Sequence, residues 1–369
     1  MSDIPRLTRH RPALPALTGI RLFAACYVVV LHTRIAPTLR EHGFMIAARF
    51  ISNGFLAVPL FFLLSGWILA YTYRGQVETS RERRHFWEAR FARIWPAYAF
   101  SLLLSTLLAH STPTAGLSVA TLLMVQAWNP LHPEYAGAWN MVCWSLSVEA
   151  FFYLCFPWCQ RRLERLSPRA LRNCVVMLVV GAIAAHTAIR TLDDQTYAGI
   201  FSYIPLPLIH LPEFLAGAAA GNLFLQTDTH RSAMHSRASQ SGMLTWLGFA
   251  ASLASLSLMH GAWSGTCVLG FSLLLYGLAS ERTWLSKLLS TRLLLIGGCI
   301  SYSIYLLQTP VRYFVKAAFT PMHAGDGVIG MLIVDMLLLL LSLATFYWIE
   351  EPARRFLRAR FASMDGSAV

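Results

Sequence analysis

A succession of long apolar runs, separated by short polar segments, constrains the fold of this chain more than any other feature. A helix that crosses a membrane needs about 20 mostly apolar residues. The composition agrees with such spans, since 56% of the 369 residues are hydrophobic and only 13% are charged. These values exclude an ordinary soluble domain. We therefore predict an all-α fold, a polytopic transmembrane helical bundle of about ten spans. The predicted spans cover approximately residues 16–34, 51–73, 93–110, 139–159, 172–190, 204–225, 243–260, 264–280, 293–313 and 327–349.

An eleventh apolar run, 115–128, is shorter, and its length suits an interfacial or re-entrant segment better than a crossing. Basic residues test this interpretation, because cytoplasmic loops carry an excess of Lys and Arg. With ten spans and a cytoplasmic N-terminus, most of the 30 Lys and Arg residues lie inside. A full crossing by 115–128 would move the basic segment 161–172 outside. We therefore predict cytoplasmic N- and C-termini, with a tail over 1–15, a membrane domain over 16–350 and a basic tail over 351–369.

The net charge of +12 does not indicate a nucleic-acid partner, because the basic residues cluster in short loops between apolar runs. The partner that the composition indicates is the lipid bilayer. The seven cysteines lie within or at the edge of apolar runs, and they form no CxxC spacing and no cluster with histidines. We expect packing roles for them, with no disulfide framework and no metal site. No cleavable signal peptide is evident at the N-terminus, so the first run is predicted to be a retained span.

The first predicted span, LTGIRLFAACYVVVLHT, carries Arg21 near one end and His32 near the other. Eleven steps of an α-helix place both side chains on one face, roughly 16 Å apart along the axis. An ionisable residue in a membrane helix is costly and so suggests a function. The alternative is that Arg21 reaches to the cytoplasmic headgroups and His32 only marks the outer boundary.

Other polar groups also lie at membrane depth. Glu149, Glu213 and Asp335 should face the bundle interior and find partners. We favour a functional role for Glu149 and a structural role for Glu213 beside a buried cation or hydroxyl. The pair Ser65 and Gly66 in FFLLSG permits close helix packing, and it would also offer a hydroxyl and exposed backbone to a ligand.

The third predicted span opens with Arg90 and Arg93, three residues apart on one helix face at the cytoplasmic surface. Arginine pairs match the oxygens of a phosphate, although ordinary anchoring at the membrane surface explains many such residues equally well. Because Arg21 is predicted on the same side, an anionic ligand entering from the cytoplasm could meet three guanidinium groups.

Several of these stretches together resemble the acyltransferase-3 family of integral membrane acyltransferases. The matching pieces, in family order, are the Arg21 and His32 pattern, FFLLSG (61–66), RFARIWPAY (90–98), WSLSVEAFFYL (144–154), PEFLAG (212–217), ISYSIYLLQTP (300–310) and YWIEEPARR (347–355). The resemblance implies transfer of an acyl group, most often acetyl, from cytoplasmic acyl-CoA to a carbohydrate or other acceptor at the outer face. It also implies that His32 is the essential histidine and that Glu149 is a functional acid. Arg21, Arg90 and Arg93, with Ser65 and Gly66 nearby, would then contact the donor.

One residue departs from the family pattern. Relatives usually carry a histidine before the proline of the YLWHxP motif, whereas this chain has Gln308. Gln308 can hydrogen-bond but cannot accept a proton at neutral pH, which suggests a supporting role or reduced activity.

We expect an enzyme of the bacterial inner membrane that uses acetyl-CoA or another acyl-CoA as a donor substrate and holds no permanent cofactor. The acceptor would be a surface or secreted carbohydrate, such as an exopolysaccharide or O-antigen unit, possibly lipid-linked. His32 would act either as a general base or as a transient acyl carrier. A transporter or flippase of an acyl carrier or glycan, and an inactive scaffold in polysaccharide assembly, are the alternatives.

Overall fold

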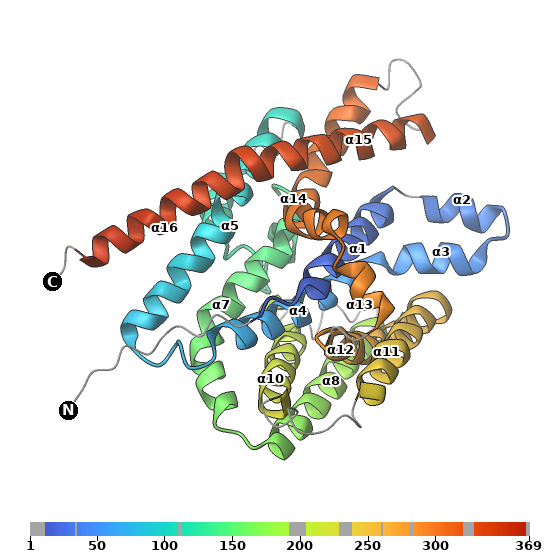
Figure 1. Cartoon of the computed structure of the whole chain (residues 1–369). Helices are drawn as coiled ribbons and strands as arrows, with labels where there is room; N and C mark the ends of the chain where they lie inside the picture. The colour runs from blue at the N-terminus through green and yellow to red at the C-terminus, as the bar shows by residue number, and fades with distance from the viewer. Residues whose placement is uncertain are drawn as a thin grey trace.

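All regular structure in the described part of the chain is helical, as predicted (Figure 1). The computed structural model describes residues 12–33, 35–109, 113–191, 204–228, 238–259, 261–280, 283–319 and 328–366. The helices are α1 (Pro15–His32), α2 (Ile35–Glu41), α3 (Met45–Ser52), α4 (Ala57–Tyr73), α5 (Ser80–Ala109), α6 (Ala115–Leu122), α7 (Cys143–Glu164), α8 (Pro168–Thr191), α9 (Leu206–Ile209), α10 (Leu211–Asp228), α11 (Ala238–Leu258), α12 (Cys267–Leu278), α13 (Trp284–Leu289), α14 (Arg292–Phe319), α15 (Val328–Thr345) and α16 (Glu351–Gly366).

Each predicted span coincides with one of these helices or with two consecutive ones. Within the described residues, six segments are long and apolar enough to cross a membrane, and α11 and α12 contain shorter apolar helices. The count of ten spans and the cytoplasmic side of both termini stay predictions. The run 115–128 forms only the eight-residue helix α6 followed by turns. Such a helix is about 12 Å long and cannot cross the hydrocarbon core.

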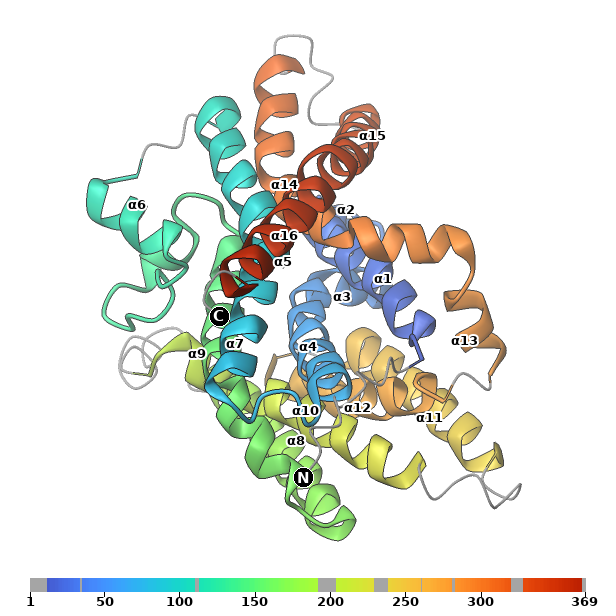
Figure 2. The same ribbon diagram turned by 60° about the vertical axis from the view of Figure 1, so that its left-hand side comes forward.

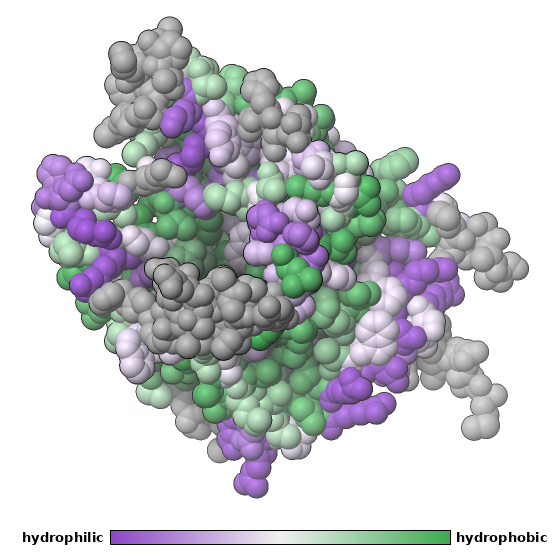
Figure 3. Space-filling model, turned by 180° about the vertical axis from the view of Figure 1, so that it is seen from behind, coloured by the Kyte–Doolittle hydropathy of each residue, from purple (hydrophilic) through white to green (hydrophobic). Residues whose placement is uncertain are grey.

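The centre of the bundle is α4, most of which is buried, whereas few residues of α8 and α15 are buried (Figure 2). Hydrophobic residues cover a large part of the face seen in Figure 3, as expected for a surface in contact with lipid. Asp335 on α15 is exposed, so the prediction that it faces the interior is wrong. Its position follows from the peripheral place of α15, and its charge interacts with Arg312 of α14.

Close contact between α4 and α10 depends on two glycines. A Cβ at Gly66 would lie 2.0 Å from the backbone oxygen of Phe214, and a Cβ at Gly217 would lie 1.9 Å from that of Leu63. Both distances are far below van der Waals contact, so only glycine lets the two backbones approach this closely. Gly66 therefore serves the packing of α4 on α10.

The last helices form one long unit that crosses α5. After α15 the chain passes through a π-helical turn, Phe346–Glu350, and continues as α16, which packs along α5 (Figures 1 and 2). Such turns insert an extra residue into a helix and are frequent at functional sites. Here the turn ends on Glu350, which is fully buried. The predicted tail 351–369 is thus helical to residue 366, and most of the predicted tail 1–15 lies outside the described residues.

Candidate functional site

A cavity of about 150 Å³ lies among α1, α4, α5, α7 and α14. Five of the predicted site residues line this cavity and come from four different helices. They are Arg21, Ser65, Arg90, Arg93 and Glu149. Apolar side chains of α4, α5 and α7 form much of the remaining wall. A small, mostly apolar cavity with a few convergent charged groups is the usual form of a ligand site.

The three arginines differ in their partners. Arg93 donates from Nη1 to Glu350 Oε1 at 2.5 Å, and Glu350 Oε2 accepts from Ser303 Oγ at 3.1 Å. Arg90 donates from Nη2 to the Tyr73 hydroxyl at 3.1 Å, while its Nε is buried without a hydrogen-bond partner within the described residues. Arg21 makes no hydrogen bond to the described part of the chain. Glu350 therefore neutralises Arg93, whereas Arg21 and Arg90 keep N–H donors for another acceptor.

Glu149 lies in the same cavity and is held by two hydroxyl groups. Ser65 Oγ donates to Glu149 Oε1 at 2.7 Å, and the Tyr153 hydroxyl, one helical turn along α7, donates to the same oxygen. Ser65 Oγ and the Tyr153 hydroxyl oxygen lie 3.3 Å apart. The hydroxyl of Ser65 therefore orients the carboxylate. Three guanidinium groups face two carboxylates here, Glu149 and Glu350, so the site carries an excess positive charge that favours an anionic ligand.

His32 lies outside the residues that line the cavity, at the C-terminal end of α1. Its Nδ1 is 2.9 Å from Gln308 Oε1, and Gln308 Nε2 donates to the backbone oxygen of Tyr305 at 2.9 Å. Because the amide nitrogen of Gln308 is used on a carbonyl, its oxygen must face His32, and this assigns the proton to Nδ1. With the proton on Nδ1, the lone pair of the His32 ring that can accept a proton is on Nε2.

One turn of α14 connects His32 with the cavity. Tyr305 lines the cavity, and its hydroxyl is 2.7 Å from Ser145 Oγ, while Gln308 contacts His32 from the next turn. Arg312, a further turn along, donates to the backbone oxygens of His32 and Val29. These bonds satisfy carbonyls that the end of α1 would otherwise leave unpaired. The end of α1 is thus fixed by α14.

Sequence reasoning missed Glu350, Tyr153 and Arg312 as members of this arrangement. A signal was present for Glu350, because an acidic residue follows the apolar letters YWI at the end of the last span. Gln308, the residue that departs from the family pattern, is a direct hydrogen-bond partner of His32. A partner so far along the chain leaves no local pattern in the sequence.

Comparison with known proteins finds acyltransferases. The sequence model described as an acyltransferase domain matches residues 14–351. Acyltransferase MdmB of Streptomyces mycarofaciens is 33% identical over 243 residues, which cover 62% of this chain and 60% of that protein. O-acetyltransferase OatA of Staphylococcus aureus is 24% identical, over 93% of this chain and 57% of that protein. The putative peptidoglycan O-acetyltransferase YrhL of Bacillus subtilis is 27% identical over 41% of this chain and 24% of its own length. The chain thus spans about 60% or less of these relatives. No solved structure matches the chain.

Proposed function

Since this chain belongs to the acyltransferase-3 family, to whose domain it matches over residues 14–351, we propose that it is a membrane O-acyltransferase with an acyl-CoA donor. It would move an acyl group, most often acetyl, to a hydroxyl of a surface or secreted carbohydrate. An exopolysaccharide or O-antigen unit, possibly lipid-linked, is the acceptor we favour. The protein would act in the bacterial inner membrane, with the donor bound from the cytoplasm.

The observation that carries this proposal is the convergence of Arg21, Arg90 and Arg93 on one cavity. Acyl-CoA has a strongly anionic nucleotide end, and guanidinium groups bind phosphate oxygens well. The free donors of Arg21 and Arg90 would bind the phosphates, while Arg93, paired with Glu350, would line the site without adding net charge. The thin pantetheine arm would then run along α1 and past Tyr305 toward His32, a distance of roughly 16 Å along the helix.

His32 would act at the acceptor end of this path. Its free Nε2 would remove the proton from the acceptor hydroxyl while that oxygen attacks the thioester carbonyl. The C–S bond then breaks, and the leaving CoA thiolate takes the proton back from the imidazolium. The alternative, in which His32 Nε2 first takes the acyl group itself, uses the same free nitrogen. Glu149 is bonded to Ser65 and Tyr153 and not to His32, so we assign its role to the donor end.

The test is the O-acyl content of surface glycans, measured by mass spectrometry and NMR in cells with and without the gene. Deletion should remove an acyl group, and the wild-type gene should restore it. His32→Ala and Arg21→Ala should not restore it, although both proteins insert at the normal level. Unchanged acylation with altered glycan export would overturn the proposal in favour of a transporter. Normal acylation by either variant would overturn the assigned site.

A further inference from the structure

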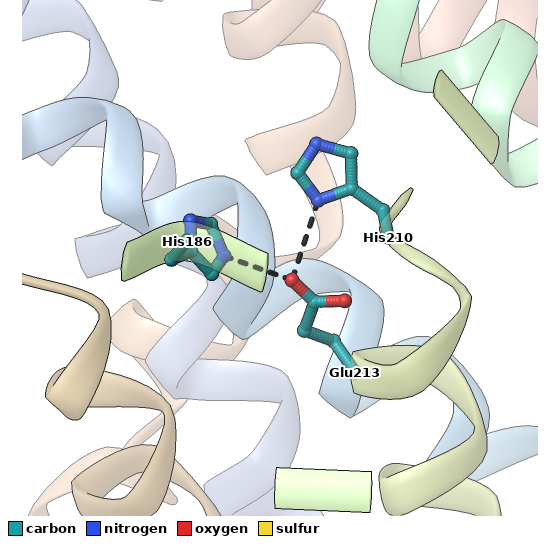
Figure 4. A group of neighbouring side chains, drawn as sticks. All are labelled: His186, His210 and Glu213. Atoms are coloured by element: carbon teal, nitrogen blue, oxygen red, sulfur yellow. Dashed lines mark hydrogen bonds and ion pairs between the residues drawn. The ribbon is translucent and has the colours of Figure 1, made fainter. Parts of the chain in front are cut away.

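A second cluster of polar side chains lies apart from the cavity, where α8 meets the junction of α9 and α10. His186 comes from the last turns of α8, His210 separates α9 from α10, and Glu213 lies in the first turn of α10 (Figure 4). His186 Nε2 is 2.9 Å from Glu213 Oε1, and His210 Nδ1 is 3.3 Å from the same oxygen. The two nitrogens and the carboxylate oxygen all lie within 4.8 Å of one another. Three potential ligands therefore surround one point.

Glu213 is the most deeply buried member of this cluster. The Glu213 side chain is only 1% exposed, against 12% for His186 and 11% for His210. Both histidines contact Oε1, whereas Oε2 is buried and has no hydrogen-bond partner within the described residues. The ion pairs of Glu213 in this part of the chain are with these two histidines. A buried carboxylate with one oxygen left without a partner is costly, and a cation beside it would remove that cost.

We infer that His186, His210 and Glu213 bind a divalent transition-metal ion of the zinc class. Two histidines and one carboxylate are a common ligand set for zinc, with a fourth position for water or a second oxygen. Ligand atoms about 2.1 Å from a tetrahedral zinc ion stand roughly 3.4 Å apart. The two nitrogen–oxygen contacts of 2.9 and 3.3 Å are close to this spacing. The two nitrogens, which lie within 4.8 Å of each other, would have to move to the same spacing. The second carboxylate oxygen, Oε2, or a water would fill the remaining position.

The surroundings hold the ligands in place. The His210 ring packs against Phe62 at 5.3 Å and Trp144 at 5.6 Å between ring centroids. A Cβ at Gly265 would lie 2.6 Å from His186 Cβ, so a side chain there would displace the histidine. Orienting contacts of this kind are typical around metal ligands. Imidazole and carboxylate together suit zinc, copper, iron or nickel better than calcium or magnesium, which prefer oxygen ligands alone.

The ion would join α8 to α10 beside the wall of the cavity, since Phe62 both lines the cavity and packs on His210. Its role would be to fix these helices, and this inference does not depend on acyl transfer. The sequence predicts a buried cation or hydroxyl beside Glu213 but does not identify the ligand set, because the three residues belong to no short motif and the two histidines lie on different elements.

The test is a metal titration of the untagged full chain, purified in detergent and treated with a chelator. The probe is Zn²⁺ alone, measured by mass spectrometry of the metal after removal of free ion. About one ion per chain should bind, and Co²⁺ in its place should give the visible absorption of a tetrahedral site. His186→Gln and Glu213→Gln should each weaken binding roughly 100-fold or more. The matched control is His132→Gln, which removes an exposed histidine 3.0 Å from Glu134 and should leave Zn²⁺ binding unchanged.

Two results would overturn the inference. One is a monodisperse wild-type protein that binds much less than one Zn²⁺ per chain at saturating metal. This result does not depend on whether any variant folds. The other is Zn²⁺ binding by folded His186→Gln and Glu213→Gln proteins with wild-type affinity. As a second measurement, Zn²⁺ should raise the melting temperature of the wild type and of His132→Gln, but not that of Glu213→Gln.

Discussion

Replacing Gln308 by methionine tests whether α14 positions His32 for proton transfer. The substitution keeps the length of an unbranched side chain but removes the oxygen that accepts from His32 Nδ1 at 2.9 Å. It also removes the bond from Gln308 Nε2 to the Tyr305 carbonyl. Without an acceptor, the Nδ1 proton is no longer fixed, and the imidazole can turn or carry its proton on Nε2.

The expected loss can be worked from this one hydrogen bond. His32 becomes positively charged when it takes the acceptor proton, and a hydrogen bond to a charged group contributes about 1.5–3 kcal/mol. At about 1.4 kcal/mol per factor of ten, kcat should fall roughly 10- to 150-fold. KM for acyl-CoA should stay unchanged, because Gln308 lies at the far end of the path from Arg21 and Arg90.

The assay is transfer of labelled acetyl from acetyl-CoA by protein reconstituted in liposomes, with the acceptor identified from the deletion strain. Thr309→Val is the matched control, since it lies next to Gln308 on α14 and its buried hydroxyl makes no hydrogen bond to the described residues. It should transfer acetyl at the wild-type rate. Wild-type kcat in Gln308→Met, or equal losses in Gln308→Met and Thr309→Val, would refute the positioning role of Gln308.

Three further substitutions, the first with a control variant, test other parts of the arrangement. Glu350→Gln leaves Arg93, whose side chain is 19% exposed, without its carboxylate partner and should clearly lower the melting temperature in detergent. Glu351→Gln, which breaks only partly exposed pairs, should change it little, and equal shifts would contradict this account. Glu149→Gln keeps an oxygen that can accept both hydroxyls but removes the charge, so transfer should fall at least tenfold at normal expression; full activity would leave Glu149 only a hydrogen-bonding role. Gly217→Ala places a Cβ 1.9 Å from a backbone oxygen of α4 and should destabilise the protein by about 1–3 kcal/mol; an unchanged melting temperature would show that the helices separate freely.

Much of the fold follows from the sequence because its causes are local. The length of each apolar run predicts a membrane helix, and the short run 115–128 indeed yields only the helix α6. The sequence also predicts that Arg21 and Arg90 lie on the same side of the membrane. Each lies near the end of an apolar run, and the distribution of basic residues predicts that both ends are cytoplasmic. Spacing on one helix likewise places Arg90 and Arg93 together.

Contacts between helices distant in sequence could not be predicted in this way. Glu350 reaches Arg93 only because a π-helical turn joins α15 to α16 and α16 packs on α5. His186 and Glu213 meet because α8 packs on α10. No sequence pattern in either helix predicts which helix it packs against. The exposure of Asp335 has the same origin, since it depends on whether α15 lies inside the bundle or at its edge.

Helix α14 packs along α1 from Thr18 to the carbonyl oxygen of His32, and this gives the path from Arg21 to His32 a fixed length. Near Arg21, α5 supplies Arg90 and Arg93, and α4 supplies Ser65. At the other end, α14 binds the last carbonyls of α1 through Arg312 and orients His32 through Gln308. The separation of Arg21 from His32 is then set by the rise of one continuous helix, roughly 16 Å over eleven residues. Because no loop contributes to this distance, a donor bound at Arg21 would present its acyl end at a fixed depth beside the free nitrogen of His32.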